Sequence, residues 1–197
     1  MPEASTLIRP YCTIEEVRRE TRNKDGHLDN WYRTCVNRAS RVVDEETQRD
    51  FWFHDHSSSA LTIKRKWIAD DTIYLPWPVL TLTEIAYDGE IRDPESYEAD
   101  GGMILTRCAW SRPAIGKALT IKGTFGYTLH DDDQGEQEPP EDIPAKIRRA
   151  TTLIASAISM EMARELIDPT GSKQSILDSR IPQEAKMLLM QFRWRFF

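Results

Sequence analysis

Two histidines flank an aspartate at residues 54–56, and no other cluster in the sequence is as similar to a metal-binding site. On a β-strand, side chains alternate between faces, so His54 and His56 would share one face and Asp55 would point to the other. Imidazole nitrogens are common zinc ligands, but a bound zinc ion takes at least three protein ligands, and no third is evident nearby. A polar loop is the favoured interpretation; a metal-dependent enzyme that uses His54, His56 and acidic residues is the alternative.

Asp131, Asp132 and Asp133 form a second cluster, which could bind a divalent cation through carboxylate oxygens. The run lacks the spaced ligands and the central glycine of an EF-hand loop. It belongs to an acidic segment, residues 129–141, that ends after Pro139-Pro140. A solvated linker is an equally good interpretation of this segment. We therefore predict no metal ligand and no cofactor.

Motifs for nucleophilic catalysis or phosphate binding are missing from the sequence. There is no G-x-S-x-G pattern, no cysteine with a convincing histidine partner and no glycine-rich phosphate loop; Gly101-Gly102 has the character of a turn. The three cysteines are far apart and lack metal-ligand spacing, so Cys35 and Cys108 are expected to be small core residues. We predict that the chain is not an enzyme.

The net charge of −6 argues against an ordinary nucleic-acid-binding protein, which would carry a basic face. One short cluster nevertheless combines cations with an aromatic ring: Lys64, Arg65, Lys66 and Trp67. Such a cluster could contact DNA phosphates or an acidic surface of a neighbouring subunit. In an acidic protein, a subunit contact is the better interpretation.

Residues 187–197 carry too many apolar side chains for a single helical stripe. Apolar groups on several faces of one segment belong to a core or to an interface. Aromatic side chains interleaved with arginine are typical of interface hot spots. We hypothesise that this tail docks on a partner, with packing inside its own subunit as the alternative. The docking residues would be Met190, Phe192, Arg193, Trp194, Arg195, Phe196 and Phe197.

The element most clearly predicted to position these groups is a helix over residues 143–166, where apolar side chains recur at steps of three and four. Asp142 stands at the N-cap position, Pro144 lies in the first turn and Asp168-Pro169 ends the helix. A single amphipathic helix gains too little by itself and needs a second apolar surface. Its stripe comprises Ile143, Ile147, Ala150, Leu153, Ile154, Ala157, Ile158 and Leu166.

Two earlier helices are predicted, over residues 14–20 and 28–49. Thr13 and Glu16 have the spacing of a capping box at the start of the first. The second has an apolar stripe that we expect to pack on the helix over 143–166, since alanines on both stripes permit close approach. This second stripe comprises Leu28, Tyr32, Cys35, Ala39, Val42 and Val43.

Between these helices the apolar period shortens to two, which predicts strands. Asp88-Gly89 is the strongest hairpin signal in the sequence, and Asp100-Gly101-Gly102 marks another turn. Tight turns between short strands imply a mostly antiparallel sheet. The predicted strands cover residues 60–66, 72–75, 80–87, 97–99, 103–106 and 118–127. The strand over 80–87 has an irregularity near Glu84.

The sequence thus predicts an α+β fold: a helical bundle of two N-terminal and two C-terminal helices with a small inserted, mostly antiparallel β-sheet. Residues 1–12 are expected to form an arm, 13–180 the main domain with a β insertion at about 60–127, and 181–197 a final helix and aromatic tail. No run approaches 18 apolar residues, and the first residues lack a secretory pattern, so we expect no membrane segment and synthesis in the cytoplasm.

Several local motifs appear along the chain in the same order as these elements. They are Tyr11-Cys12-Thr13-Ile14-Glu15-Glu16-Val17, Ala39 before Val42-Val43, Leu75-Pro76, Leu82-Thr83-Glu84-Ile85, Asp88-Gly89, Tyr97, Ala118 through Tyr127, and Ile143-Pro144-Ala145-Lys146-Ile147 with Ala150, Ala157 and Arg164. This series resembles the head–tail connector (adaptor, or head-completion) proteins of long-tailed bacteriophages. The likeness covers about residues 11–190 and rests on degenerate patterns.

The resemblance implies a structural virion protein at the neck of the particle, made in the host cytoplasm. Such proteins form a ring of about twelve subunits under the portal, which extends the DNA channel and joins the capsid to the tail through a downstream head-completion or tail protein; a closed ring needs heterologous contacts. DNA would pass without sequence-specific binding, so an acidic lining is suitable. The candidate channel or rim residues are Asp131, Asp132, Asp133, Glu136 and Glu138.

Two other functions remain open alongside this one. One is the metal-dependent enzyme described above, which stoichiometric metal in the purified protein would favour. The other is a regulatory or interaction module of cellular origin, which the neighbouring genes would distinguish from a phage protein.

Overall fold

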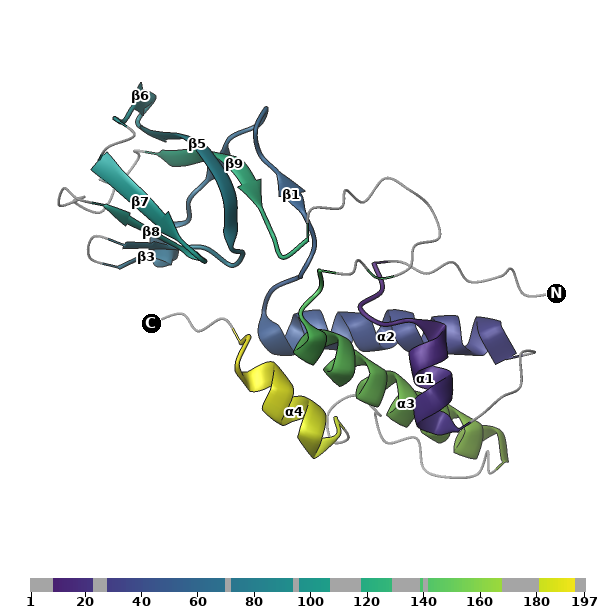
Figure 1. Ribbon diagram of the computed structural model, residues 1–197. Coiled ribbons are helices and arrows are strands. Elements are labelled where there is room, and N and C mark those ends of the chain that lie inside the picture. The colour runs from purple at the N-terminus through teal and green to yellow at the C-terminus, as the bar shows by residue number, and fades with distance from the viewer. Residues whose placement is uncertain are drawn as a thin grey trace. The chain divides into compact units, whose positions relative to one another are not determined.

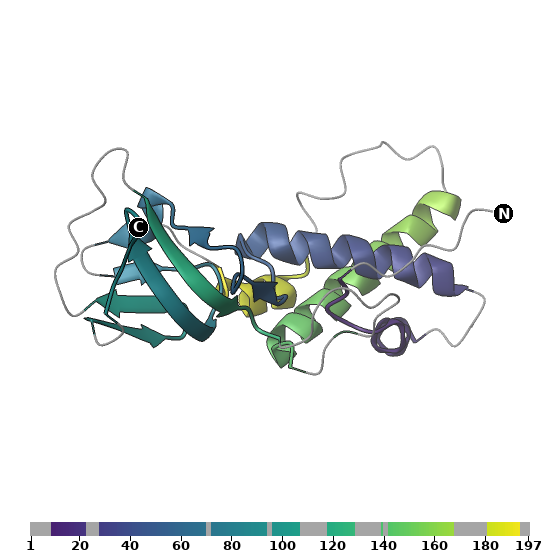
Figure 2. The same cartoon turned by 90° about the horizontal axis from the view of Figure 1, so that it is seen from above.

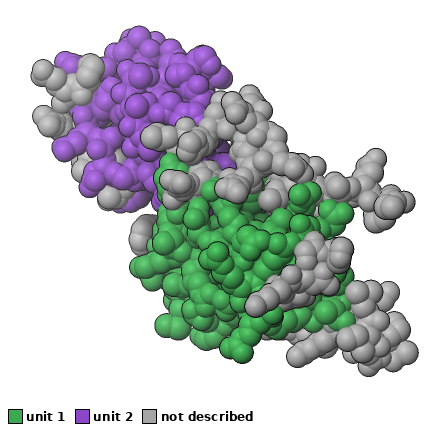
Figure 3. Space-filling view, turned by 45° about the vertical axis from the view of Figure 1, so that its right-hand side comes forward, with its two compact units in different colours: residues 1–48, 132–193 green, residues 49–131, 194–197 purple. Residues whose placement is uncertain are grey.

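The computed structural model describes residues 9–22, 28–69, 72–93, 96–106, 118–128, 139, 142–167 and 181–193. These residues fall into two compact units, which are coloured separately in Figure 3. Unit 1 is helical and draws on Met1–Gln48 and Asp132–Arg193, whereas unit 2 is built of strands and draws on Arg49–Asp131. The α+β fold predicted from the sequence is confirmed, with the strands inserted between helices of one unit.

Unit 1 contains four described helices, α1 (Ile14–Thr21), α2 (Asp29–Thr47), α3 (Ala145–Ile167) and α4 (Gln183–Met190). Figure 1 shows α3 crossing α2, with α1 and α4 against different parts of α3, and Figure 2 shows the same crossing from above. Helices α2 and α3 are far apart in the sequence, and the chain of unit 2 lies between them.

Helix α1 begins with the capping box that the sequence predicted. The Thr13 hydroxyl accepts a hydrogen bond from the Glu16 amide at 3.1 Å, and the Glu16 carboxylate accepts one from the Thr13 amide at 2.7 Å. These two bonds satisfy backbone donors that a helix start otherwise leaves open. Arg18 pairs with Asp29, which attaches α1 to the start of α2.

The predicted N-terminal arm is already part of the core at its last two residues, Tyr11 and Cys12, which are completely buried. The Tyr11 amide donates to the Ser40 hydroxyl at 3.2 Å, and the Tyr11 hydroxyl donates to the Asp44 carboxylate at 2.5 Å. Both partners lie on α2, so this segment is fixed to the helix before α1 begins.

The α2 stripe is buried as predicted except at its first residue, since Leu28 precedes the helix and is 37% exposed. On α3 the buried surface is wider than one stripe, because α1, α2 and α4 all contact this helix. The widening buries hydroxyl side chains, and two of them bond to the helix itself: Thr151 donates to the Ile147 carbonyl and Thr152 to the Arg148 carbonyl, each at 2.9 Å. Leu153 and Ala157, assigned to the predicted stripe, are only half-buried.

Unit 2 holds two antiparallel sheets where the sequence predicted one. The first has the order β1-β9-β5-β6, with β2 also pairing to β9, and the second has the order β3-β4-β8-β7. The strands are β1 (His54–Asp55), β2 (Leu61–Thr62), β3 (Ile68–Ala69), β4 (Thr72–Tyr74), β5 (Val79–Tyr87), β6 (Glu90–Ile91), β7 (Tyr97–Asp100), β8 (Met103–Thr106) and β9 (Leu119–Phe125). Figure 2 shows β5 and β9 as long curved neighbours.

Two local predictions for this unit are wrong. The strand predicted for 60–66 is only β2, after which Arg65–Trp67 forms a 3-10 turn, because Ile63 and Trp67 must both enter the core. The loop predicted around His54 contains the short strand β1, which pairs His54 with Phe125. The hairpin predicted at Asp88-Gly89 is confirmed: both residues have positive φ, at 54° and 85°, which suits a two-residue turn between β5 and β6.

Strand β5 carries a register shift between Leu82 and Glu84, which confirms the predicted irregularity. Opposite it, Gly123 on β9 has a φ of +157°, and a Cβ atom at this position would lie 2.1 Å from the Thr81 carbonyl oxygen. The strands approach too closely there for any side chain.

We expect Gly123→Ala to lower the free energy of unfolding of unit 2 by about 3 kcal/mol or more, because backbone must move to accept the methyl group. Gly89→Ala is the control, since nothing lies within 4 Å of its Cβ position and only the positive φ opposes alanine; its cost should be about 1 kcal/mol. Urea unfolding followed by tryptophan fluorescence measures both. Equal losses in the two variants would contradict the close approach at Gly123.

Two cysteine thiols lie in the core of unit 1. Cys12 and Cys35 are completely buried, and burial raises the pKa of Cys12 to about 12 and that of Cys35 to about 11 from an ordinary 9.0. Cys35 was predicted to be a small core residue, and the structure confirms this; Cys108 lies outside the described residues. The fold favours the neutral thiol, whereas the thiol of the unfolded chain ionises near pH 9. The contribution of each buried thiol to stability is therefore complete below pH 9 and is lost as the pH rises toward the pKa of the folded state.

We therefore expect the wild-type protein to lose stability above pH 9 faster than Cys12→Ala does. At pH 10.5 the Cys12 thiol is ionised in the unfolded chain but neutral in the folded one. Between pH 8 and pH 10.5 the free energy of unfolding of the wild type should therefore fall by about 2 kcal/mol more than that of Cys12→Ala. Denaturant unfolding of both proteins at pH 8 and pH 10.5 gives the comparison. Parallel losses would show that Cys12 is not protected from ionisation by the fold.

Candidate functional site

The last described helix, α4, presents two exposed methionines on one face. Met187 and Met190 are 62% and 61% exposed, and their spacing of three residues places them side by side on a helix. The opposite face of α4 holds Ala185 and Leu189, which are buried, and the helix packs mainly on α3. Methionine is flexible and polarisable, so an exposed pair of this kind can adapt to the surface of a partner. We call Met187 and Met190 the methionine face.

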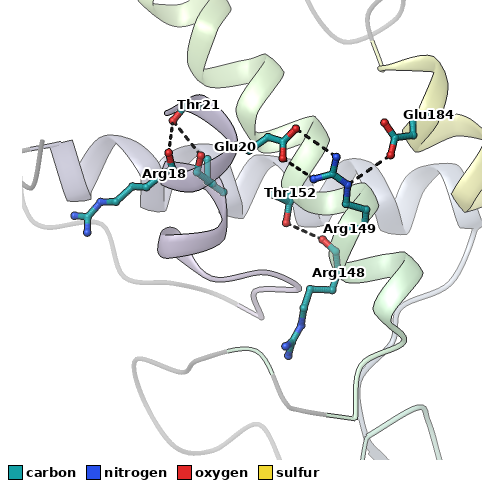
Figure 4. A network of polar contacts seen from close by, with 8 residues as sticks. Arg18, Glu20, Thr21, Arg148, Arg149, Thr152 and Glu184 are labelled. Atoms are coloured by element: carbon teal, nitrogen blue, oxygen red, sulfur yellow. Dashed lines mark hydrogen bonds and ion pairs between the residues drawn. The ribbon is translucent and has the colours of Figure 1, made fainter. Parts of the chain in front are cut away.

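Arg149 on α3 contacts side chains of both α1 and α4 (Figure 4). Its guanidinium forms two hydrogen bonds with the Glu20 carboxylate on α1, at 2.5 and 3.4 Å, and its Nε lies 3.5 Å from a carboxylate oxygen of Glu184 on α4. The hydrogen bond to Glu20 is the main cause of the raised pKa of Arg149. One cation therefore links three helices, and Lys146 adds a second link from α3 to Gln191.

The segment that follows α4 contains the predicted docking residues. The Phe192 amide donates to the Leu189 carbonyl at 2.9 Å, and Phe192 is half-buried while Arg193 is exposed. Residues 194–197, with Trp194, Arg195, Phe196 and Phe197, lie outside the described residues. Within the described part of the tail, the structure therefore places Met190 and Arg193 at the surface.

The basic cluster at residues 64–67 divides into two parts. Lys64, Arg65 and Lys66 are exposed, but the Trp67 ring is only 6% exposed and belongs to the core of unit 2. The core of unit 2 covers the Trp67 ring, which leaves Lys64, Arg65 and Lys66 at the surface, and the subunit contact stays a prediction. The Lys64 ammonium lies 5.3 Å from the centroid of the Trp67 ring, within the range of a cation–π contact.

The two histidines of the 54–56 cluster have separate partners. His54 Nε2 lies 2.6 Å from the Asp50 carboxylate, and the His54 ring is 4.0 Å from the ring of Trp77. His56 Nδ1 is 3.2 Å from the Ser59 carbonyl oxygen. Asp55 accepts hydrogen bonds from Ser57, which lower its pKa. In the described ranges, no three histidine, cysteine, aspartate or glutamate side chains are grouped so that they could hold a metal ion.

The predicted channel or rim residues, Asp131, Asp132, Asp133, Glu136 and Glu138, lie outside the described residues. Of the helices that the structure describes, none combines the length and the apolar character needed to cross a membrane.

Comparison with known proteins gave no relative: no protein-family model and no curated protein matches this chain.

Sequence reasoning found the apolar C-terminal segment but missed what supports it. Glu20, Arg149 and Glu184 come from three separate stretches of the chain, and each is an ordinary charged residue on a predicted helix. No local pattern could have brought them together, because their proximity depends on how α1, α3 and α4 pack.

We expect Arg149→Ala to destabilise unit 1 by about 1 kcal/mol, because the partners are partly solvated and such pairs are screened. The effect should shrink in 0.5 M salt, since surface ion pairs weaken with ionic strength. Arg41→Ala, an exposed position on α2, is the control and should change stability by less than about 0.5 kcal/mol. Chemical denaturation at low and high salt tests this, and a salt-independent loss would point to packing instead of charge.

Proposed function

We propose that the chain is a head–tail connector of a long-tailed bacteriophage, a non-enzymatic virion protein that forms a ring under the portal. The methionine face carries this proposal, since an exposed apolar pair on the last described helix precedes residues 192–197, which alternate aromatic and basic side chains. Exposed apolar surface of this kind, next to aromatic residues and arginine, is what protein interfaces use.

The arrangement of unit 1 also supports an assembly role. Helix α4 buries Ala185 and Leu189 and packs mainly on α3, and this packing orients its exposed face within unit 1. A pre-organised surface binds more tightly than a flexible one because less conformational entropy is lost on binding. In this proposal the methionine face and the residues after it bind the portal, while other surfaces contact neighbouring subunits and the next protein of the neck.

The remaining parts of the proposal follow from the resemblance to connectors. The ring would have about twelve subunits, as closed rings with heterologous contacts allow. DNA would pass through the channel without sequence-specific contacts, past the acidic segment that contains Asp131 and Glu138. The protein would reside at the neck of the virion.

Binding to the portal protein encoded by the same genome tests the proposal. We expect the variant Met187→Gln/Met190→Gln to bind the portal at least tenfold more weakly, a loss of about 1.4 kcal/mol, because both side chains would lose apolar burial at the contact. Isothermal titration or surface plasmon resonance gives the affinity. Electron microscopy of the wild-type complex should show rings with a central channel.

Met160→Gln is the matched control. Met160 is 51% exposed on α3 and lies outside α4, so this variant should bind like wild type. If Met187→Gln/Met190→Gln binds the portal as tightly as Met160→Gln and the wild type do, α4 is not the docking surface. If the wild-type protein neither binds the portal nor forms rings, the connector proposal itself is wrong.

A further inference from the structure

The structure describes the side chains of four methionines, and three of these are open to solvent. Met187 and Met190 on α4 are 62% and 61% exposed, and Met160 on α3 is 51% exposed. No described residue donates a hydrogen bond to the sulfur atom of any of these three side chains. The lone pairs of each thioether sulfur are therefore accessible to small molecules in solution.

Met162, the fourth of these methionines, is protected. Its side chain is half-buried, and its sulfur accepts hydrogen bonds from the Cys35 thiol at 3.9 Å and from the Arg38 guanidinium at 3.7 Å. Both donors lie on α2 and Met162 lies on α3, so this sulfur is part of the contact between the two helices. The lone pairs of a structural methionine are thus occupied, whereas those of the methionine face are open to solvent.

An exposed thioether reacts with peroxides by oxygen transfer. A sulfur lone pair attacks one oxygen of hydrogen peroxide, the O–O bond breaks, an S–O bond forms and water leaves, so the sulfur is oxidised and the peroxide is reduced. The product, methionine sulfoxide, carries a polar oxygen where the side chain was apolar. Methionine sulfoxide reductases reverse the change by oxidising two thiols to a disulfide, with release of water.

The position of the methionine face allows this modification without loss of the fold. Helix α4 packs on α3 through its other side, where Ala185 and Leu189 are buried. A sulfoxide on Met187 or Met190 therefore stays in water in the free protein and leaves the packing of α4 intact. At an apolar contact with a partner, the same oxygen would lose its hydrogen bonds to water, which disfavours binding.

We propose that Met187 and Met190 form a peroxide-sensitive modification site, and that their conversion to sulfoxides prevents the methionine face from docking on its partner. This inference rests on the proposed function, in which that partner is the portal. The oxidation state then regulates the docking surface, because the thioether form binds and the sulfoxide form does not. A docked partner excludes solvent from both sulfur atoms, so docking in turn protects them from peroxide.

Hydrogen peroxide treatment of the wild-type protein, followed by peptide mass spectrometry, tests the site itself. We expect Met187 and Met190 each to gain one oxygen atom at least about fivefold faster than Met162, because oxidation follows the exposure of the sulfur. In protein unfolded by guanidinium the rates should converge, since the fold no longer protects Met162. If Met162 reacts as fast as the methionine face in the folded protein, the assignment of the site is wrong.

The affinity for the portal protein encoded by the same genome tests the consequence. After removal of peroxide by gel filtration, the oxidised wild-type protein should bind the portal at least about tenfold more weakly than untreated protein, and sulfoxide reductases should restore binding. Met187→Leu/Met190→Leu keeps two apolar side chains but has no sulfur there, so its affinity should be the same before and after treatment. Circular dichroism confirms that the oxidised protein is folded.

Met160→Leu is the matched control for the loss of an exposed methionine. It removes an oxidisable side chain on α3 and leaves Met187 and Met190 in place, so peroxide should weaken its binding as it does for the wild type. If Met160→Leu instead becomes insensitive to peroxide, the regulating methionine lies on α3 and the inference is wrong.

The outcomes distinguish this inference from the connector proposal. If oxidised and untreated wild-type protein bind the portal equally well, the inference is wrong and the connector proposal is unaffected. If Met187→Leu/Met190→Leu loses affinity on treatment as the wild type does, oxidation elsewhere is responsible and the inference is again wrong. If untreated wild-type protein does not bind the portal, the connector and the regulation of docking are both wrong, and faster oxidation of Met187 and Met190 supports the modification site alone.

Discussion

The packing of α2 on α3 is the contact on which the rest of the structure depends. Trp31 donates its indole N–H to the Ser159 hydroxyl at 3.0 Å, and Cys35 and Met162 bring their sulfur atoms to 3.9 Å across the same contact. These pairs join residues more than 120 positions apart in the sequence. The chain between them includes unit 2, whose buried side chains form a core of their own.

Three other helices contact α3, so some of the side chains on its surface must be small enough to let these helices come close. Large apolar side chains on every side would not fit, so small hydroxyl residues fill part of the surface. The hydroxyls of Thr151 and Thr152 donate hydrogen bonds to carbonyls one turn earlier, which removes most of the cost of burying them. The charged side of the same helix then uses Arg149 to connect α1 and α4, so one element provides both the core and the support of the methionine face.

Charged side chains are exposed near both edges of the second sheet of unit 2. Ile63, Trp67 and Ile68 lie in its core, and the three cations between Ile63 and Trp67 are exposed just before the edge strand β3. Strand β7, with three exposed positions in four, carries the opposite charge. Exposed edges of sheets invite pairing with other chains, and charges placed there select which pairing is allowed.

From the sequence alone one can predict the α+β class, the capping box at Thr13, the hairpin at Asp88-Gly89 and the irregularity in β5, because capping, turn chemistry and apolar period are local properties. Tertiary packing is needed to know that Trp67 is buried while its basic neighbours are exposed, and that Tyr11 and Cys12 belong to the core. The same packing brings Glu20, Arg149 and Glu184 together and divides the strands into two sheets. These outcomes depend on contacts between residues distant in the sequence, and hydrophobic burial is non-directional, so a local pattern cannot say which surface covers which side chain.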